Sequence, residues 1–314
     1  MKDKTKSILF RADSSSKIGT GHIMRDLVLA TQYKDSNIIF ATQNLSGNIN
    51  HKIFEAGYKL EILQSNQLKE LNQLIQKYNA DMLVIDHYEI DYKFEKKLKE
   101  NNPQLILLSF DDTYEKHYCD ILLNHNISAD KKRYKDLVPK NCELRCGSQY
   151  TLLRDEFYKQ KKKRKQRFKT KNSKFKIFLA MGGADHSNIT RKILNVLESF
   201  DNIKTHVVTT SANKNLHELR QYIENKKWVK LYIDSDKIAK LMKKSDFAII
   251  SPSVTANEAS FMNLPFIAVK TADNQNDMYQ YLKRKKYLVL EQFNIKNLNT
   301  TIKNIIQKLD KHNE

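Results

Sequence analysis

Glycine is scarce in this chain of 314 residues, and its placement constrains the fold more than any other feature. The chain holds seven glycines, and four of them fall at two equivalent places. Gly19 and Gly21 follow the first apolar run of the chain, and Gly182 and Gly183 follow another at 175–181. A helix-like segment comes next in both places. A glycine turn between a buried strand and a helix leaves backbone N–H groups free at the positive end of the helix, where phosphate binds readily. Two such turns therefore predict two similar domains facing one phosphorylated ligand.

Short apolar runs alternate with helically spaced segments through both halves of the chain. In the first half, we predict strands at 7–10, 37–41, 59–63, 82–85, 105–108 and 121–123, and helices at 21–33, 48–56 and 68–78. In the second half, we predict strands at 175–181, 205–209, 229–233, 247–250 and 265–269, and helices at 188–200, 216–225, 236–244, 254–262 and 274–285. This alternation implies right-handed crossovers and parallel sheets. The fold class predicted is α/β, with two Rossmann-like domains that face across a cleft and bind the ligand at the carboxyl ends of their strands.

A basic run at 159–167 marks the clearest boundary in the chain. It predicts an N-terminal domain at 1–158, a basic linker at 159–173 and a C-terminal domain at 174–314. The formal net charge of +19 leaves open a second interpretation, in which residues 159–176 bind nucleic acid. We favour a solvated linker and no nucleic-acid partner, because the basic residues are mostly dispersed over predicted helices.

The composition disfavours several kinds of protein. Cys119, Cys142 and Cys146 contain no CxxC pair, so we expect reduced thiols rather than a zinc site. No stretch approaches the roughly 18 apolar residues of a membrane span, and the charged start of the chain lacks the apolar region of a secretion signal. We therefore expect a cytoplasmic protein without a membrane span.

One short motif resembles a metal site. Asp234-Ser235-Asp236 has the DxD pattern of some glycosyltransferases, but it lies where a helix should begin, which favours capping. No other metal motif is present in the sequence. We expect neither a metal nor a cofactor.

The segment 11–26 is the densest in reactive side chains. His22 follows the glycines in the first turn of a predicted helix, where the positive helix end disfavours imidazolium, so a neutral His22 could accept a proton from water. The alternative is a histidine that merely caps the turn. Asp86 and Tyr88 come just after the buried run 82–85, where side chains point at the cleft. The alternative for Asp86 is that it caps the turn or the next helix. The glycines at 19 and 21 alone are a weak motif, because the third glycine of the dinucleotide fingerprint is missing.

The second candidate site lies at two helix starts of the C-terminal half. Gly182 and Gly183 allow close approach of the backbone to a phosphate. Small and hydroxyl side chains at 251–256 suit a diphosphate, and Glu258, one turn later, could accept hydrogen bonds from ribose hydroxyls. The alternative is a plain turn at the glycines and an N-cap at Ser253.

The order of these motifs resembles that in the UDP-sugar hydrolases of pseudaminic acid synthesis. The opening signature is Arg11-Ala12-Asp13 with the segment 18–25, which reads Ile-Gly-Thr-Gly-His-Ile-Met-Arg. The motifs that follow in the family's order are Asp86-His87-Tyr88, Ser109-Phe110-Asp111-Asp112, Asp120-Ile121-Leu122-Leu123-Asn124, Tyr150-Thr151-Leu152-Leu153-Arg154, Met181-Gly182-Gly183-Ala184-Asp185 and Asp273-Asn274-Gln275. The resemblance covers nearly the whole chain, and its specificity lies in the ordered set.

This resemblance implies a GT-B fold and the hydrolysis of UDP-2,4-diacetamido-2,4,6-trideoxy-β-L-altropyranose to UDP and a free sugar. That sugar feeds a nonulosonic acid that decorates flagellin or other surface glycans. By position, the resemblance implies that His22 is catalytic, that Tyr88 and Asn274 help to hold water and sugar, and that Glu258 binds ribose. The remaining residues expected to bind UDP or substrate are Arg11, Asp13, Gly19, Thr20, Gly21, Arg25, Asp86, Gly182, Gly183, Ser253, Val254, Thr255 and Gln275.

The mechanism expected from these residues is a single displacement at the anomeric carbon. Water held by His22, Tyr88 and Asn274 attacks from the face opposite UDP, with inversion, while backbone amides stabilise the departing diphosphate. The substrate and water are the only partners expected, and no oligomeric state is predicted. A GT-B glycosyltransferase that passes a UDP-amino sugar to an acceptor is the main alternative, and the nucleic-acid-binding protein is the second.

Overall fold

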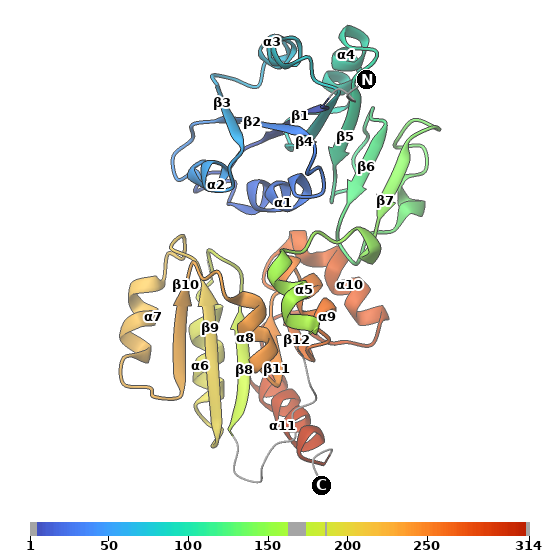
Figure 1. Cartoon of the computed structure of the whole chain (residues 1–314). Coiled ribbons are helices and arrows are strands. Elements are labelled where there is room, and N and C mark those ends of the chain that lie inside the picture. The colour runs from blue at the N-terminus through green and yellow to red at the C-terminus, as the bar shows by residue number, and fades with distance from the viewer. Residues whose placement is uncertain (1–4, 163–173, 186, 312–314) are drawn as a thin grey trace. The chain divides into compact units, whose positions relative to one another are not determined.

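The computed structural model describes residues 5–162, 174–185 and 187–311. The chain forms two compact units, Met1–Leu153 and Arg154–Glu314, and each is built on its own sheet (Figure 1). Most of the expected basic linker lies outside the described residues. Its first residues belong to helix α5 (Asp155–Lys162), which is part of the second unit.

The sheet of the first unit has seven parallel strands in the order β3-β2-β1-β4-β5-β6-β7. These strands are β1 (Ser7–Ala12), β2 (Asn37–Gln43), β3 (Lys59–Leu63), β4 (Met82–Asp86), β5 (Ile106–Phe110), β6 (Ile121–Asn124) and β7 (Glu143–Cys146). The helices of the unit are α1 (Gly21–Ala30), α2 (His51–Glu55), α3 (Leu68–Tyr78) and α4 (Tyr92–Asn101), with short 3-10 helices η1 (Lys131–Tyr134) and η2 (Ser148–Tyr150).

Alternating side chains of these strands build two apolar cores, one on each face of the sheet. Ile8 and Phe10 of β1 pack with residues of α1 and α2, whereas Leu9, between them, packs with residues of α3 and α4. Successive side chains of a strand point to opposite faces, so a strand covered on both sides is apolar throughout. The continuous apolar runs in the sequence therefore predicted these central strands correctly.

The sheet of the second unit has six parallel strands in the order β10-β9-β8-β11-β12-β13. They are β8 (Phe175–Ala180), β9 (Ile203–Thr209), β10 (Val229–Ile233), β11 (Phe247–Ile250), β12 (Phe266–Val269) and β13 (Leu288–Leu290). Besides α5, the helices are α6 (Ile189–Leu197), α7 (Leu216–Ile223), α8 (Ile238–Lys244), α9 (Val254–Phe261), α10 (Asn276–Arg284) and α11 (Ile295–Lys311), with the 3-10 helix η3 (Asp273–Gln275).

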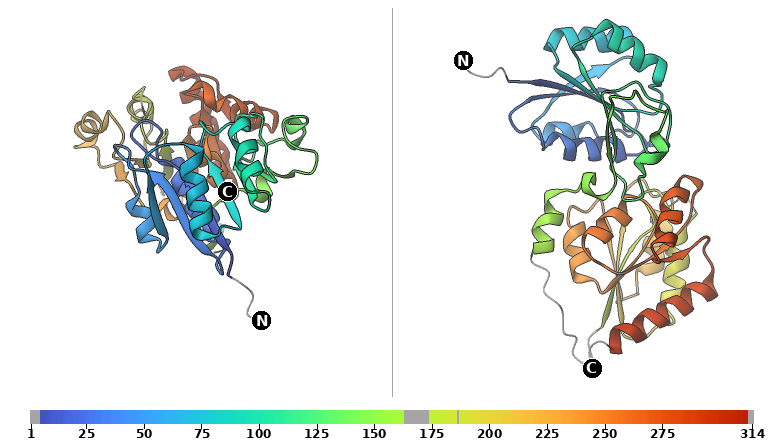
Figure 2. Two further views of the ribbon diagram at one scale, coloured as in Figure 1. Left: turned by 90° about the horizontal axis from the view of Figure 1, so that it is seen from above. Right: turned by 90° about the vertical axis from the view of Figure 1, so that its right-hand side faces the viewer.

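The core of the second unit contains residues from helices that lie early and late in its sequence. Ile193 of α6, Leu219 of α7 and Ile302 of α11 all belong to the cluster that contains Leu179 and Ile249 of the sheet. Figure 2 gives two further views of the chain, and the long red helix near the C mark in its right-hand view is α11. The prediction of two Rossmann-like α/β units with parallel sheets is confirmed.

Two strands and several helices were not predicted. The strands β7 and β13 are edge strands, and their residues are exposed or half-buried. An edge strand buries less apolar surface than a central one, so its sequence carries a weaker signal.

No helix in the described part of the chain combines the length and apolar character that a membrane crossing requires.

The register of the first sheet brings polar residues to one edge. Ala12 at the end of β1 pairs with Asp86 at the end of β4. The neighbouring strand β5 ends at Phe110, which is followed by Asp111 and Asp112. Because parallel strands end on the same side, these carboxylates collect at the carboxyl edge of the sheet.

A buried ionic cluster anchors α4 beneath this edge. Glu95 of α4 is fully buried and accepts hydrogen bonds from Ser109 of β5 (2.6 Å) and from the backbone of Tyr118 (2.6 Å). Nδ1 of His117 lies 2.8 Å from the same carboxylate, and Nε2 lies 3.9 Å from Asp111. Burial alone would lower the pKa of His117, but its interactions with Asp111 and Glu95 raise it to about 10.

This cluster predicts a pH dependence of stability. The folded pKa of His117 lies above its ordinary value of 6.5, so its stabilising charge is fully present below that pH and is lost as pH rises through about 10. We expect the free energy of unfolding, measured by urea denaturation, to fall over this interval by on the order of 3 kcal/mol. His117→Gln should flatten this slope, whereas His51→Gln should not. An unchanged slope in His117→Gln would contradict the assignment.

Candidate functional site

The loop between β1 and α1 is a tight turn that ends at the start of the helix. Ser15 and Gly19 exchange backbone hydrogen bonds of 3.2 and 2.8 Å across it. Gly19 has φ +89°, a conformation that glycine adopts without steric cost. Thr20 occupies the N-cap position without a side-chain cap, and a Cβ at Gly21 would meet no atom within 4 Å. The start of α1 therefore borders open space.

His22 lies in the first turn of α1 and is bound to Asp86. Nδ1 of His22 is 2.6 Å from Oδ1 of Asp86, which is 2% exposed. An ionised carboxylate only accepts, so Nδ1 carries a proton, and in the neutral ring the lone pair is then on Nε2. Among the described residues, Nε2 has no hydrogen-bond partner. The alternatives in which His22 or Asp86 merely caps a turn are wrong, because the two side chains bind each other.

Arg25 lies one helical turn after His22 and holds the same carboxylate. Its Nε donates to Oδ2 of Asp86 at 2.5 Å, and its Nη2 donates to Oδ1. The guanidinium also lies 4.9 Å from the ring centre of Phe110. Burial alone would raise the pKa of Asp86, but Arg25 and His22 together hold it well below the usual range. Asp86 is therefore an ionised anchor for two side chains of α1.

Tyr88 and Asp112 extend this cluster. The hydroxyl of Tyr88 donates to Oδ1 of Asp112 at 3.1 Å, and Nη1 of Arg25 donates to Oδ2 at 3.2 Å. The ring of Tyr88 meets that of His22 edge-on, with centroids 5.0 Å apart, while Tyr88 itself is 65% exposed. The structure therefore brings His22, Asp86, Tyr88 and Arg25 together.

Arg11 and Asp13 form a separate buried pair. Nη1 and Nη2 of Arg11 donate to the two carboxylate oxygens of Asp13, both at 2.7 Å. Asn66 accepts from Nε of Arg11 at 3.1 Å, and His87 lies 3.1 Å from Asp13. Both members of the pair are almost fully buried. Their charged groups are thus engaged within the protein, where they hold the start of the loop 13–20 in place.

The glycine turn of the second unit follows β8. Gly182 has φ +88°, and a Cβ at Gly183 would lie 3.0 Å from the hydroxyl of Thr210. Asp185 then caps α6, because its carboxylate accepts from the backbone of Ile189 (2.9 Å) and Thr190 (3.1 Å). Backbone conformation at 182 and side-chain packing at 183 each favour glycine here.

The start of α9 lacks the expected side-chain cap. Ser253 occupies the N-cap position, but its hydroxyl lies 3.1 Å from that of Ser251 and makes no cap hydrogen bond. The first residues of the helix are Val254 and Thr255, and Val254 is 45% exposed. The N-cap position predicted for Ser253 is confirmed, but its hydroxyl faces that of Ser251 and does not cap the helix.

Glu258 lies one turn into α9 beside Arg154. Nη2 of Arg154 is 3.6 Å from Oε1 of Glu258 and 3.0 Å from Oε1 of Glu156. Burial raises the pKa of Glu258 to about 7, although the charge of Arg154 acts in the opposite direction. The carboxyl group can thus change its charge near neutral pH.

Asn274 and Gln275 lie in η3 and differ in their surroundings. Oε1 of Gln275 accepts from the backbone of Thr271 at 2.8 Å and so closes the turn before α10. Asn274 is exposed, and its side chain makes no hydrogen bond to a described residue.

The DxD segment takes a different role from the one expected. Asp234 accepts from the backbone of Ser211 at 3.1 and 3.2 Å and does not cap α8, which begins at Ile238 with no side-chain cap. The capping prediction at this place is wrong, since Asp234 supports the loop after β9. Among the described residues, no cluster of three or more His, Cys, Asp or Glu side chains could hold a metal ion.

A curated protein similar to this chain is the UDP-2,4-diacetamido-2,4,6-trideoxy-β-L-altropyranose hydrolase of Campylobacter jejuni. It is 40% identical over 282 residues, which cover 90% of this chain and 98% of that protein. The chain belongs to this family of hydrolases. No family model matches the sequence.

Solved structures confirm the fold of this family member. MurG of Acinetobacter baumannii aligns with a TM-score of 0.62 at 10% identity, covering 96% of this chain and 91% of that one. Spinosyn rhamnosyltransferase SpnG aligns with a TM-score of 0.65 at 11% identity, covering 96% and 92%. The fold is therefore the two-domain GT-B arrangement of Rossmann-like units.

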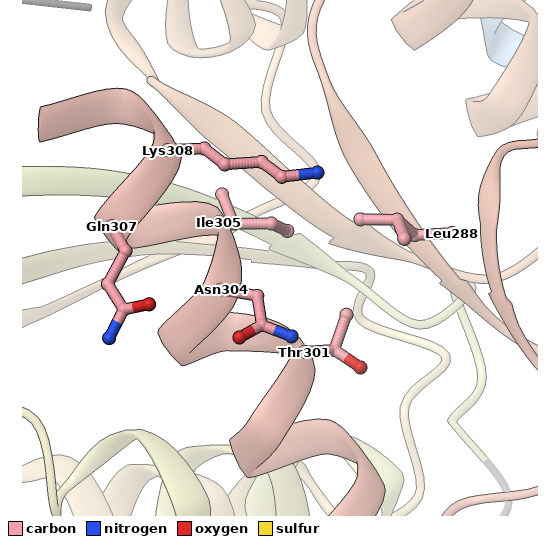
Figure 3. Close-up of a pocket in the computed structure, with 6 residues that line it drawn as sticks. All are labelled: Leu288, Thr301, Asn304, Ile305, Gln307 and Lys308. Carbon is pink, nitrogen blue, oxygen red and sulfur yellow. The ribbon is translucent and has the colours of Figure 1, made fainter. Parts of the chain in front are cut away.

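A pocket of about 330 Å³ lies in the second unit (Figure 3). Its lining comes from β13 and α11 and consists of Leu288, Thr301, Asn304, Ile305, Gln307 and Lys308. None of these residues was predicted to bind substrate.

Sequence reasoning missed Asp112, Phe110 and Arg154 as members of the two sites. In the sequence, Asp111 and Asp112 stand out only as part of the ordered motif 109–112 after an apolar run. Asp111 does close a turn, since it accepts from the backbone of Thr113 at 2.9 Å. Only the three-dimensional structure shows that Asp112 accepts hydrogen bonds from Arg25 and Tyr88.

Asp86→Asn should destabilise the fold, because it leaves the largely buried guanidinium of Arg25 without its main counter-ion. Breaking such a pair commonly costs about 3–5 kcal/mol of unfolding free energy. Urea denaturation at neutral pH would measure this loss. Glu55→Gln, which removes the exposed pair with Lys52, is the matched control and should leave stability nearly unchanged. Equal stability of Asp86→Asn and wild type would refute the anchoring role.

Proposed function

We propose that the protein hydrolyses UDP-2,4-diacetamido-2,4,6-trideoxy-β-L-altropyranose to UDP and the free sugar, in the route to pseudaminic acid. The Campylobacter relative carries this activity in its name. The single observation that carries the mechanism is the His22–Asp86 pair, in which Nδ1 is bound at 2.6 Å and Nε2 has no partner among the described residues.

In this proposal His22 is the general base. Nε2 takes a proton from water as the water oxygen bonds to C1 of the sugar, and the bond between C1 and the diphosphate oxygen breaks with its electron pair on UDP. Asp86 stabilises the imidazolium that forms and fixes the ring orientation. Tyr88, edge-on to His22, and the exposed Asn274 are proposed to position water and sugar.

UDP is proposed to bind through the second unit. The glycine turn at 182–183 and the uncapped start of α9 offer backbone N–H groups to the diphosphate. Ser253, Val254 and Thr255 supply this helix start, and Glu258 is proposed to bind the ribose. Gln275 supports the turn that carries Asn274.

The remaining predicted residues are proposed to shape the sugar side of the site. Gly19, Thr20 and Gly21 keep the start of α1 open for a charged ligand, and the Arg11–Asp13 pair braces the loop that leads to it. Arg25 orients Asp86. These roles need no cofactor.

Incubation with the UDP-sugar in ¹⁸O-water tests the function itself. We expect UDP release without any added acceptor, with the label at C1 of the free sugar, because water attacks carbon. Mass spectrometry of both products measures this. Label in UDP would mean attack at phosphorus, and release only in the presence of an acceptor sugar would favour the glycosyltransferase alternative.

His22→Asn should lower kcat by about 10²–10⁴-fold, the usual contribution of a general base. The dissociation constant for UDP should change little, since the proposal places the nucleotide on other residues. Steady-state kinetics and calorimetric UDP titration separate the two effects. His51→Asn is the control, because His51 lies on the surface at the start of α2. Parallel losses of turnover and UDP affinity would count against the base role.

A further inference from the structure

Asp26 is a fully buried carboxyl group that the mechanism above does not use. It lies on α1 four residues after His22, so both side chains project from the same face of the helix. Its exposure is 0%. Neither of its oxygens receives a hydrogen bond from a described residue. An ionised carboxylate buried without a donor is strongly disfavoured.

The charged and titratable groups that act on Asp26 come from two elements. Among the described residues, the charge of Asp86 at the end of β4 raises the pKa of Asp26, and the charge of Arg25 of α1 lowers it. Nε and Nη2 of Arg25 both donate hydrogen bonds to Asp86. His125, after β6, adds no charge, because burial and the charge of Arg25 lower its pKa to about 3. Arg25 also donates to Asp112, so its single positive charge does not offset the charges of Asp86 and Asp26 together.

Two carboxyl groups that repel each other when both are ionised, as Asp26 and Asp86 do, cannot both lose their protons at low cost, so one keeps its proton. Asp86 is the better anion, since His22 and Arg25 donate to both of its oxygens. Asp26 has no such donors and must therefore be the partner that holds the proton. As a neutral acid it becomes a donor, and the Asp86 carboxylate, whose charge acts on it, is an acceptor.

We infer that Asp26 is a positioning residue, a neutral carboxylic acid whose O–H donates to Asp86 and so extends the His22–Asp86 pair to a third member. The hydrogen bond keeps the Asp86 carboxylate oriented toward His22 and Arg25. It also spreads the negative charge of Asp86 and thereby limits how strongly that charge attracts a proton to His22. The effect on catalysis rests on the function proposed above, whereas the protonation state of Asp26 does not.

Stability measurements test the protonation state without any substrate. Asp26→Asn is nearly isosteric, donates through its amide and never ionises. If Asp26 is neutral when folded, the wild type must take up a proton on folding above about pH 4, so its stability falls as pH rises. The urea midpoint of Asp26→Asn should therefore exceed that of wild type at about pH 8 and converge with it near about pH 4.

The opposite result would overturn the inference. An ionised Asp26 stabilised by Arg25 would make Asp26→Asn less stable than wild type, and increasingly so as pH rises. Asp35→Asn, at an exposed position, is the control and should show no such pH-dependent difference. An infrared band of a protonated carboxyl group at neutral pH, present in wild type and missing in Asp26→Asn, is the independent check. Its absence from wild type would also refute the assignment.

Kinetics test the positioning role. Asp26→Leu, which cannot donate, should lower kcat at least about tenfold and move the acid limb of the kcat–pH profile to higher pH, because Asp86 then attracts a proton to His22 more strongly. Asp26→Asn should restore both turnover and the acid limb. A downward shift of that limb in Asp26→Asn would show that a negative charge had been removed. If the wild type fails to hydrolyse the UDP-sugar, the stability and infrared results still decide the state of Asp26.

Discussion

The ion pair between Asp86 and Arg25 is the interaction on which the rest of the first site depends. It forms because α1 starts directly after a glycine turn and β4 ends beside β1 in the sheet. The pair keeps Asp86 ionised despite its burial, and only an ionised Asp86 fixes the tautomer of His22. The orientation of the His22 imidazole therefore depends on the sheet register that places Asp86 beside the end of β1.

Each unit contributes a different kind of electrostatics. The first unit gathers side-chain charges around Asp86 and braces its loop with the separate pair of Arg11 and Asp13. The second unit offers backbone dipoles at a glycine turn and at the uncapped helix α9. Side chains that exchange protons suit bond cleavage, and fixed dipoles suit a departing diphosphate. The proposed mechanism uses both features, and the chain belongs to a hydrolase family and has the GT-B fold.

Much of the fold could be predicted from the sequence because the central strands are apolar on both faces. The edge strands β7 and β13 and the highly charged helix α4 were missed, since little of their surface is buried. The start of α4 is set by Asp91, which accepts from the backbone of Phe94 at 2.9 Å. His22, Asp86 and Tyr88 were predicted as site residues from their places after strands, but their mutual contacts depend on the sheet register. Asp112 and Asp26 could not be found this way, because a single carboxylate in a sequence says nothing about which charges surround it.

The central position of β1 has a consequence for how the chain is made. The first strand pairs directly with β4, whose residues follow some seventy positions later, as in the pairing of Ile8 with Met82. No short nascent fragment can complete the middle of this sheet, so Ile8 to Ala12 must stay unpaired on one side until β4 has left the ribosome. Long-range parallel pairing forms slowly, and the strand edges that remain unpaired until then are prone to aggregation. An incomplete chain therefore presents an open strand edge at β1 until β4 is available to cover it.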